Sequence, residues 1–337
     1  MNRPPAALSL DLDNLWSYLK THGDPGWRAY PTYLPGFIPD ILEWLDRRGL
    51  RITFFVVGRD AADKRNASAL KRLAPAGHEI GNHSYEHEPW LQAYRADALA
   101  AEIERSEDAV ADATGSRPRG FRGPGFSWTP ALLEILAGRG YRYDSTPLPT
   151  FIGPIGRRYY FSRAVLTPGE RAVRSRLYGR FRDGFQPVKP FRWSLPSGRR
   201  LIEVPISTMP LFRTPFHLSY LLYLGRISEG LMRAYLESAL AACRAAGLRP
   251  NFLLHPLDFL GPDEAPGLAF FPGMDLNKRT KLRLAGRALD ILAGRCKLLP
   301  LGAFVEALDR EGRIDRVQTA VEAGPGNAPQ SKRQGRP

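Results

Sequence analysis

Histidine is rare in this 337-residue chain, yet three of its six histidines lie in the stretch GHEIGNHSYEHEPW, residues 77–90. Two of them, His83 and His87, are four residues apart. Imidazole nitrogen is a common ligand of zinc and related divalent ions. The pair is therefore the first candidate for a site that does chemistry.

Other chemically capable side chains end apolar segments that have the pattern of strands. Asp11 and Asp13 end SLDLDN, Arg122 lies in FRGPG, and His255 follows NFLL. Strand side chains alternate between two faces, so the two aspartates share a face. In a parallel α/β barrel the C-terminal ends of the strands line the mouth of the active site. We therefore expect these groups and the histidine pair to meet at one rim.

Each feature also has a structural explanation when it is taken alone. A D-x-D pair at a strand end more often caps a turn, and a single H-x-x-x-H pair is as readily a surface accident as a site. A histidine after an apolar strand is more often a hydrogen-bonded core residue. These explanations weaken together, because independent accidents would not place all four features at strand ends of one barrel.

The chemistry of these residue types fits one reaction. One aspartate and two histidines suit Zn²⁺ or a similar ion and leave positions open for water and substrate. Such an ion lowers the pKa of bound water from about 15.7 towards about 7. The second aspartate would accept the proton of that water, Arg122 would hold this aspartate ionised, and His255 would protonate a leaving amine. The residues therefore predict amide hydrolysis.

The elements that must position these groups follow an alternation of strand and helix. We expect strands at 7–12, 51–58, 78–83, 120–125, 141–145, 201–207, 251–256 and 297–301. We expect helices at 36–49, 69–77, 97–114, 130–138, 227–246, 276–293 and 302–308, the fourth opened by Thr129 and Pro130. This alternation predicts an α/β fold with seven or eight βα units, closed or nearly closed into a barrel.

One domain is expected over residues 1–316. Residues 147–200 are rich in proline, glycine, arginine and aromatic residues and show no clear period, so we interpret them as an insertion. The tail, residues 317–337, is polar and rich in proline and glycine, which predicts disorder.

Composition sets further limits. The chain has 43% hydrophobic and 24% charged residues and no apolar run of the length of about 20 residues that a spanning helix needs. The N-terminal MNRPPAALSLDLDN leaves no room for a secretory signal, so we expect a cytoplasmic location. Cys243 and Cys296 are expected to be buried free thiols.

With these motifs the sequence resembles the polysaccharide deacetylases with the NodB homology fold, carbohydrate esterase family 4, over residues 7–146 and 201–308. The resemblance implies a deformed (β/α)7–8 TIM-like barrel. Its first motif matches SLDLDN and implies that Asp11 is the catalytic base and Asp13 a metal ligand. Its second motif matches HSYEH and implies that His83 and His87 are the other metal ligands. Zinc is the expected metal, with cobalt, nickel, manganese or iron as alternatives.

The later motifs imply further roles. RGPG implies that Arg122 orients the base and that the backbone N–H of Gly125 contributes to the oxyanion hole. LLH implies that His255 is the general acid, and GYRYDST makes Asp144 a candidate for a supporting role. Three departures stand out: the first motif leads into a longer aromatic loop, Gly125 replaces an aromatic residue found in many members, and no partner that would steady His255 is evident.

These observations favour hydrolysis of an N-acetyl or N-formyl group of an amino sugar, in a soluble or a lipid-phosphate-linked glycan precursor. The alternative is a basic nucleic-acid-binding or membrane-binding protein on a barrel scaffold without catalytic activity. The complete metal and acid–base set argues against pure binding.

The net charge of +14 is concentrated in one segment. Residues 157–200 carry twelve arginines and lysines against two acidic residues, interleaved with aromatic residues, and apolar PLFRTPFHLSYLLYLG follows at 210–225. Basic and aromatic residues suit an anionic membrane surface, here the inner face of the cytoplasmic membrane. Nucleic acid is the less favoured partner, because it would leave the apolar stretch without a use. The oligomeric state stays open.

Overall fold

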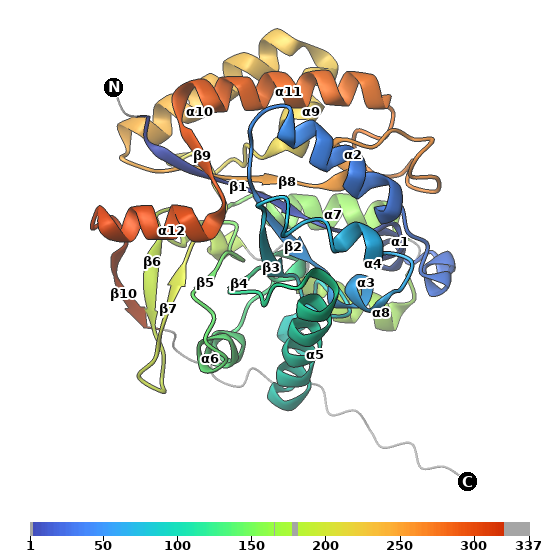
Figure 1. The fold of residues 1–337 in the computed structure, drawn as a ribbon, viewed down its shortest axis with the longest axis horizontal. Coiled ribbons are helices and arrows are strands. Elements are labelled where there is room, and N and C mark those ends of the chain that lie inside the picture. The colour runs from blue at the N-terminus through green and yellow to red at the C-terminus, as the bar shows by residue number, and fades with distance from the viewer. Residues whose placement is uncertain (1–2, 165, 177–180, 320–337) are drawn as a thin grey trace.

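The structure is a computed structural model that describes residues 3–319 apart from 165 and 177–180 (Figure 1). Its strands are β1 (Pro5–Asp11), β2 (Thr53–Val56), β3 (Glu79–Asn82), β4 (Gly120–Phe121), β5 (Tyr143–Asp144), β6 (Phe191–Ser194), β7 (Arg200–Glu203), β8 (Asn251–Leu254), β9 (Lys297–Leu299) and β10 (Asp315–Thr319). Its α-helices are α1 (Leu15–His22), α2 (Leu34–Asp46), α3 (Gly58–Ala62), α4 (Ala67–Leu70), α5 (Ala96–Thr114), α6 (Pro130–Gly138), α7 (Gly153–Arg163), α8 (Pro168–Val173), α9 (Leu218–Ile227), α10 (Glu229–Ala245), α11 (Lys278–Arg295) and α12 (Leu301–Arg310). Its 3-10 helices are η1 (Pro25–Ala29), η2 (Leu91–Ala93), η3 (Pro124–Phe126), η4 (Arg174–Arg176), η5 (Phe181–Phe185) and η6 (Pro256–Asp258).

The strands form one curled sheet in the order β10-β6-β7-β5-β4-β3-β2-β1-β8, with β9 paired to β1. Every pair is parallel except β6 and β7. Parallel strands covered on both faces are apolar along their whole length. This explains β1, β2 and β8, in which every residue is buried.

An irregular segment after β7 bridges β8, at one end of the curled sheet, and β5. The backbone N–H of Ser207 donates to the carbonyl of Asn251 in β8 (3.1 Å), and the Asn251 N–H donates to Ser207 Oγ (2.7 Å). On its other side the segment is held to β5, because Val204 N–H donates to the carbonyl of Asp144 (2.8 Å). The architecture is thus the α/β fold with a curled parallel sheet, a deformed barrel, that the sequence predicts.

Helices cover the outside of the sheet. Figure 1 shows α2, α10 and α11 along one side, α5 projecting at the opposite side, and α12 beside β6, β7 and β10. The predicted helices α2, α5, α6, α10, α11 and α12 are present. Thr129 caps α6 as expected, since its hydroxyl accepts from the Leu132 N–H (3.1 Å). The helix predicted at 69–77 is only the short α4 followed by turns.

Outside the insertion, α1, α3 and α9 lie where no helix was predicted. α1 occupies the stretch expected to be an aromatic loop, and Asn14 starts it by accepting from the Leu15 N–H (2.8 Å). α9 lies in the apolar stretch 210–225 and beyond it, where a nearly continuous run of apolar residues conceals the helical period.

Residues 147–200 leave the barrel after β5 and return at β7, and they include α7, α8 and β6 rather than irregular chain alone. Arg174 ties this insertion to α1. Its guanidinium donates to the carbonyls of Thr21 (3.0 Å) and Lys20 (3.2 Å), both in the last turn of that helix.

The first residues of the expected tail belong to a strand. β10 includes residues 317–319, the first residues of the expected disordered tail, and pairs with β6; residues 320–337 lie outside the described part. Cys243 and Cys296 are buried free thiols, as predicted. Within the described residues, no helix combines the length and hydrophobicity that crossing a membrane requires.

Candidate metal and acid–base site

The predicted site residues lie at the C-terminal ends of β1, β3, β4 and β8, four strands of one part of the sheet. Asp11 is the last residue of β1, whereas His83, Arg122 and His255 each directly follow a strand, namely β3, β4 and β8. The sheet order places these strands within one continuous run from β4 to β8. Parallel strands end on the same side, so the four groups share one rim.

Asp13, His83 and His87 form a compact buried cluster at this rim. One ligand atom from each of the three lies within 4.8 Å of the other two. Asp13 Oδ1 lies 2.8 Å from Nε2 of His87 and 3.3 Å from Nε2 of His83. Two imidazole nitrogens and one carboxylate oxygen converging in this way are a donor set for a divalent ion such as Zn²⁺.

The hydrogen bonding of His83 suits a metal ligand. Its Nδ1 lies 2.6 Å from the backbone carbonyl of Arg122. A carbonyl only accepts, so Nδ1 carries the proton and the lone pair of Nε2 points to the cluster. The Nδ1 of His87 is buried and has no hydrogen-bond partner among the described residues.

The turn between the two histidines brings both rings to Asp13. Ser84 and His87 have positive φ angles of 61° and 48°, which reverse the chain within four residues. A buried carboxylate on α5 holds this turn. Glu102 Oε1 accepts from the backbone N–H groups of Tyr85 (2.8 Å) and Glu86 (2.7 Å).

Electrostatics in the cluster favour ionised Asp13. Burial would raise the pKa of Asp13, but His87 and His83 outweigh this effect and hold it well below its usual range. Burial likewise lowers the pKa of His83, but Asp11 and Asp13 outweigh it and raise this pKa. The cluster without an ion thus attracts positive charge, which a divalent cation supplies.

Asp11 lies beside the cluster but is engaged by a different partner. Its Oδ1 accepts from Nη1 of Arg122 at 2.6 Å, and its Oδ2 faces the cluster, 4.0 Å from Nε2 of His83. One carboxylate oxygen is therefore held by a cation while the other points towards the metal ligands. This is the arrangement of a base beside a metal site.

Arg122 is fully buried and fixed on all sides. It donates from Nη1 to Ser9 Oγ (2.8 Å), from Nε to the carbonyl of Ser145 (2.9 Å) and from Nη2 to Ser145 Oγ (2.9 Å). Its guanidinium carbon lies 4.3 Å from the centre of the Phe55 ring. The side chain that orients Asp11 therefore has a single position.

His255 has two partners that the sequence did not reveal. Its Nδ1 lies 3.3 Å from Ser219 Oγ, on α9, and 3.9 Å from Oδ2 of the buried Asp258. The same Oδ2 accepts from the His255 backbone N–H (2.8 Å). Burial raises the pKa of Asp258, while the neighbouring His255 opposes that rise. The buried Lys281 secures this loop by donating to the carbonyls of Leu257 (2.7 Å) and Leu260 (2.8 Å).

Two further side chains border the site without a sequence signal. The ring centroid of buried His217 is 5.8 Å from that of His255. Burial, with His255 and Arg122 nearby, lowers the pKa of His217 well below its usual range, so this imidazole is neutral. The buried Tyr18 hydroxyl has no hydrogen-bond partner among the described residues. Burial raises the pKa of Tyr18 well above its usual range, and the nearby Asp13 adds to this rise.

Gly125 lies in the turn η3 with a φ of 60°. A Cβ at this position would lie 2.3 Å from Cβ of Pro89, which follows the histidine turn. Positive φ and this contact together explain why glycine stands here.

Among the described residues, no hydrogen bond joins Asp144 to Arg122, whereas Ser145 accepts two from it. Asp144 accepts from Thr146 Oγ1 (2.6 Å) and is paired in register with Glu203 of β7. Burial raises the pKa of Asp144 to about 6. Burial and the neighbouring Asp144 raise the pKa of Glu203 well above its usual range. Burial therefore favours the protonated form of Glu203 beside Asp144, behind the rim.

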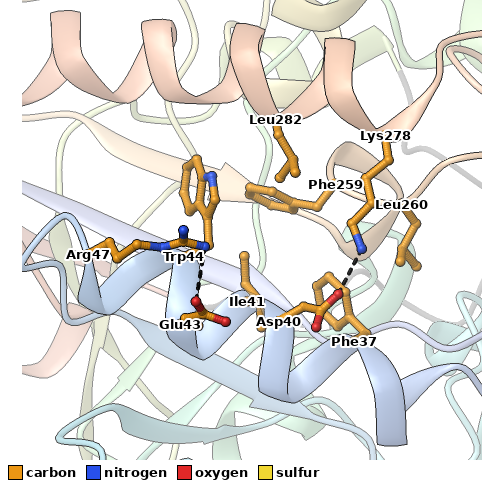
Figure 2. Close-up of a pocket in the computed structure, with 10 residues that line it drawn as sticks. All are labelled: Phe37, Asp40, Ile41, Glu43, Trp44, Arg47, Phe259, Leu260, Lys278 and Leu282. Carbon is orange, nitrogen blue, oxygen red and sulfur yellow. Dashed lines mark hydrogen bonds and ion pairs between the residues drawn. The ribbon is translucent and has the colours of Figure 1, made fainter.

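A groove of about 250 Å³ lies elsewhere, on the outer surface between α2 and α11. Figure 2 shows its apolar floor and the ion pairs Asp40–Lys278 and Glu43–Arg47 at its edges. None of the predicted site residues lines it.

Part of the chain matches a known protein family. Residues 24–143 match the family model described as polysaccharide deacetylase. The matched segment includes His83, His87, Arg122 and Gly125. The remaining predicted residues lie outside it, so their assignment depends on the rim geometry.

Curated relatives match over short segments. The chain is 30% identical to the chitin deacetylase of Colletotrichum lindemuthianum over 117 residues, which are 34% of this chain and 47% of that protein. It is 34% identical to a peptidoglycan-N-acetylglucosamine deacetylase of Bacillus cereus over 88 residues, 26% of this chain and 31% of that protein. The matches thus span less than half of each of these relatives.

A similar fold is found over almost the whole chain in a putative polysaccharide deacetylase from Mycobacterium smegmatis. The TM-score is 0.59 at 19% identity, covering 96% of this chain and 95% of the other. At this identity the likeness concerns the fold.

Proposed function

Since the chain belongs to the polysaccharide deacetylase family, we propose that it is a metal-dependent hydrolase that removes an N-acyl group, acetyl or formyl, from an amino sugar. The observation that carries the proposal is the buried Asp13–His83–His87 cluster with the Asp11–Arg122 pair directly beside it.

Asp13, His83 and His87 would hold the ion. A divalent ion at such a site activates water as a nucleophile near neutral pH and polarises the acyl carbonyl. The free oxygen of Asp11 accepts the proton that the attacking water loses, because Arg122 holds the other oxygen. The backbone N–H of Gly125 is proposed as a donor to the carbonyl oxygen as it gains negative charge.

His255 completes the reaction as the general acid. Breaking the C–N bond leaves a basic amine, which takes the proton from His255. Ser219 and Asp258 hold the His255 ring from the side of Nδ1, which leaves Nε2 for the substrate. The products are the carboxylic acid and the free amino sugar, and water supplies the oxygen atom.

The substrate proposal follows from the relatives' names and the basic insertion. A chitin deacetylase and a peptidoglycan-N-acetylglucosamine deacetylase are among the relatives, which supports an N-acylated amino sugar. We propose that the sugar belongs to a glycan precursor, either soluble or carried on a lipid phosphate. The twelve basic residues between 157 and 200 support a phosphate-bearing carrier.

Mass spectrometry of nucleotide-linked and lipid-linked sugars tests this proposal. We would compare cells with the wild-type chain, cells without it, and cells with Asp13→Ala. One N-acylated amino sugar should accumulate in the last two. A binding protein without catalytic activity would function equally well with Asp13→Ala, so unchanged sugar pools in that strain would refute the hydrolase.

A further inference from the structure

We infer that the rim around the mouth of the barrel docks onto an anionic lipid bilayer. The nine most exposed large apolar side chains of the described residues all lie between 155 and 231 of the chain. They are Ile155, Phe181, Phe185, Leu211, Phe212, Tyr220, Tyr223, Ile227 and Leu231, and we call them the apolar rim. Large apolar side chains that are exposed together in neighbouring segments mark interaction sites.

The first part of the apolar rim is an aromatic cluster on the insertion. The ring of Phe151 packs between those of Phe181 (4.9 Å between centroids) and Phe185 (5.0 Å). Gly184 makes this packing possible, because a Cβ there would lie 2.2 Å from the Phe151 ring. Phe185 is nevertheless 70% exposed. The cluster is thus braced on its inner side and open outward.

The second part is a loop that the insertion holds in place. Leu211 and Phe212 are 78% and 71% exposed. The neighbouring Arg213 donates to the carbonyl of Gln186 (2.9 Å), and its own carbonyl accepts from Thr150 Oγ1 (2.7 Å). These bonds join the loop to the aromatic cluster as one surface.

The third part is α9, which runs along the mouth. Its first turn lies at the acid histidine, since Ser219 contacts His255. Its last turn carries Arg226, which is paired with Asp275 (3.0 Å), just before α11. Tyr220, Tyr223 and Ile227 recur at three- and four-residue steps, so they form one outward stripe. An amphipathic helix with aromatic residues is suited to lie in the plane of a membrane interface.

The charge of the same region selects the kind of membrane. Residues 157–200 carry a net charge of +10 out of the chain's +14. Arg158, Arg182 and Lys189 are exposed, and Arg182 directly follows Phe181 of the apolar rim in the chain. Basic residues close to apolar anchors favour anionic lipid headgroups over neutral ones. A nucleic acid would be attracted by the charge but would gain nothing from side chains such as Leu211.

When the apolar rim lies on the bilayer, the proposed active site faces the lipid surface. The segments that bear the apolar rim leave the C-terminal ends of β5 and β7, the side where Asp11, His83 and His255 lie. A sugar on a lipid phosphate would then reach the site without leaving the bilayer. This last step rests on the proposed hydrolase activity, whereas the docking itself does not.

Co-sedimentation of the full chain with vesicles tests the inference. Wild type should bind vesicles containing phosphatidylglycerol at least about tenfold more tightly than pure phosphatidylcholine vesicles, and salt should weaken the binding. The double variant Leu211→Ser with Phe212→Ser should lose about tenfold or more in affinity, and so should Arg158→Gln with Arg182→Gln. Lys71→Gln with Arg72→Gln removes the same charge where the chain leads into the start of β3, away from the rim, and should bind like wild type.

Several results would overturn the inference. They are equal binding to neutral vesicles, tighter binding to an RNA or DNA oligonucleotide than to vesicles, and a dimer that the Leu211→Ser and Phe212→Ser changes dissociate. His83→Ala separates docking from catalysis, because it should bind vesicles like wild type. If His83→Ala binds vesicles normally while sugar pools never depend on the chain, the hydrolase proposal fails and the docking stands.

Discussion

Arg122 and Asp11 form a buried ion pair, 2.6 Å from Nη1 to Oδ1, that joins the ends of β4 and β1. Removing one partner of a buried pair leaves an uncompensated charge, which typically lowers the free energy of unfolding by about 3–5 kcal/mol. We expect Arg122→Met to cause a loss of this size in urea denaturation. The double variant Asp11→Asn with Arg122→Met should regain part of the loss. If the double variant loses as much free energy of unfolding as the two single variants lose together, the two residues are not coupled.

Glu102 holds the turn between the two histidine ligands although it contacts neither ring. Mutation of a group that orients a metal ligand typically lowers the metal affinity by about 10- to 100-fold. We expect Glu102→Ala to weaken zinc binding by this amount in a competition titration with a chelator. Glu104→Ala, an exposed residue on the same helix, is the control and should bind zinc like wild type. Identical affinities in the two variants would remove Glu102 from the account.

His255 acts as the acid in the proposed reaction, so its loss should affect turnover and not metal content. We expect His255→Ala to lower kcat by about 10²- to 10⁴-fold, because this is the usual value of general acid–base catalysis. Asp258→Asn should lower kcat less and move the alkaline limb of the pH profile. Nearly full turnover in His255→Ala would make this histidine a structural residue.

The buried Asp60 should make the free energy of unfolding depend on pH. Its Oδ1 accepts from Asn14 (2.7 Å) and Trp16 (2.8 Å), yet burial raises its pKa from 3.8 to about 7. The folded chain keeps this proton up to about pH 7, whereas the unfolded chain releases it near pH 4, so stability falls as the pH rises through this window.

Asp60→Asn should remove this dependence. Relative to the variant, wild type should lose about 3 kcal/mol between pH 5 and pH 8 in chemical denaturation. Asp46→Asn, at an exposed ion pair with Arg51, is the matched control. Parallel pH profiles for wild type and Asp60→Asn would mean that Asp60 is ionised throughout this range.

The sequence predicts the strand ends well, because each is an apolar run followed by a polar residue, as at Asp11 and His255. It does not predict the groups that orient them. Glu102 reaches the histidine turn from α5, and Ser145 reaches Arg122 from the end of β5; both contacts depend on how neighbouring elements pack, which leaves no local pattern in the sequence. Asp258 lies three residues after His255, but that spacing alone does not distinguish a partner from a turn cap. The helix α9 was missed for a different reason, since its apolar residues extend beyond one face.

The metal content of the purified protein is the most direct test of the central claim, because every catalytic role depends on the cluster of Asp13, His83 and His87. Elemental analysis of protein purified without chelator should find one divalent ion per wild-type chain and almost none in His83→Ala. His22→Gln, which changes a histidine at the end of α1, should retain the ion. Equal metal content in wild type and His83→Ala would contradict the account.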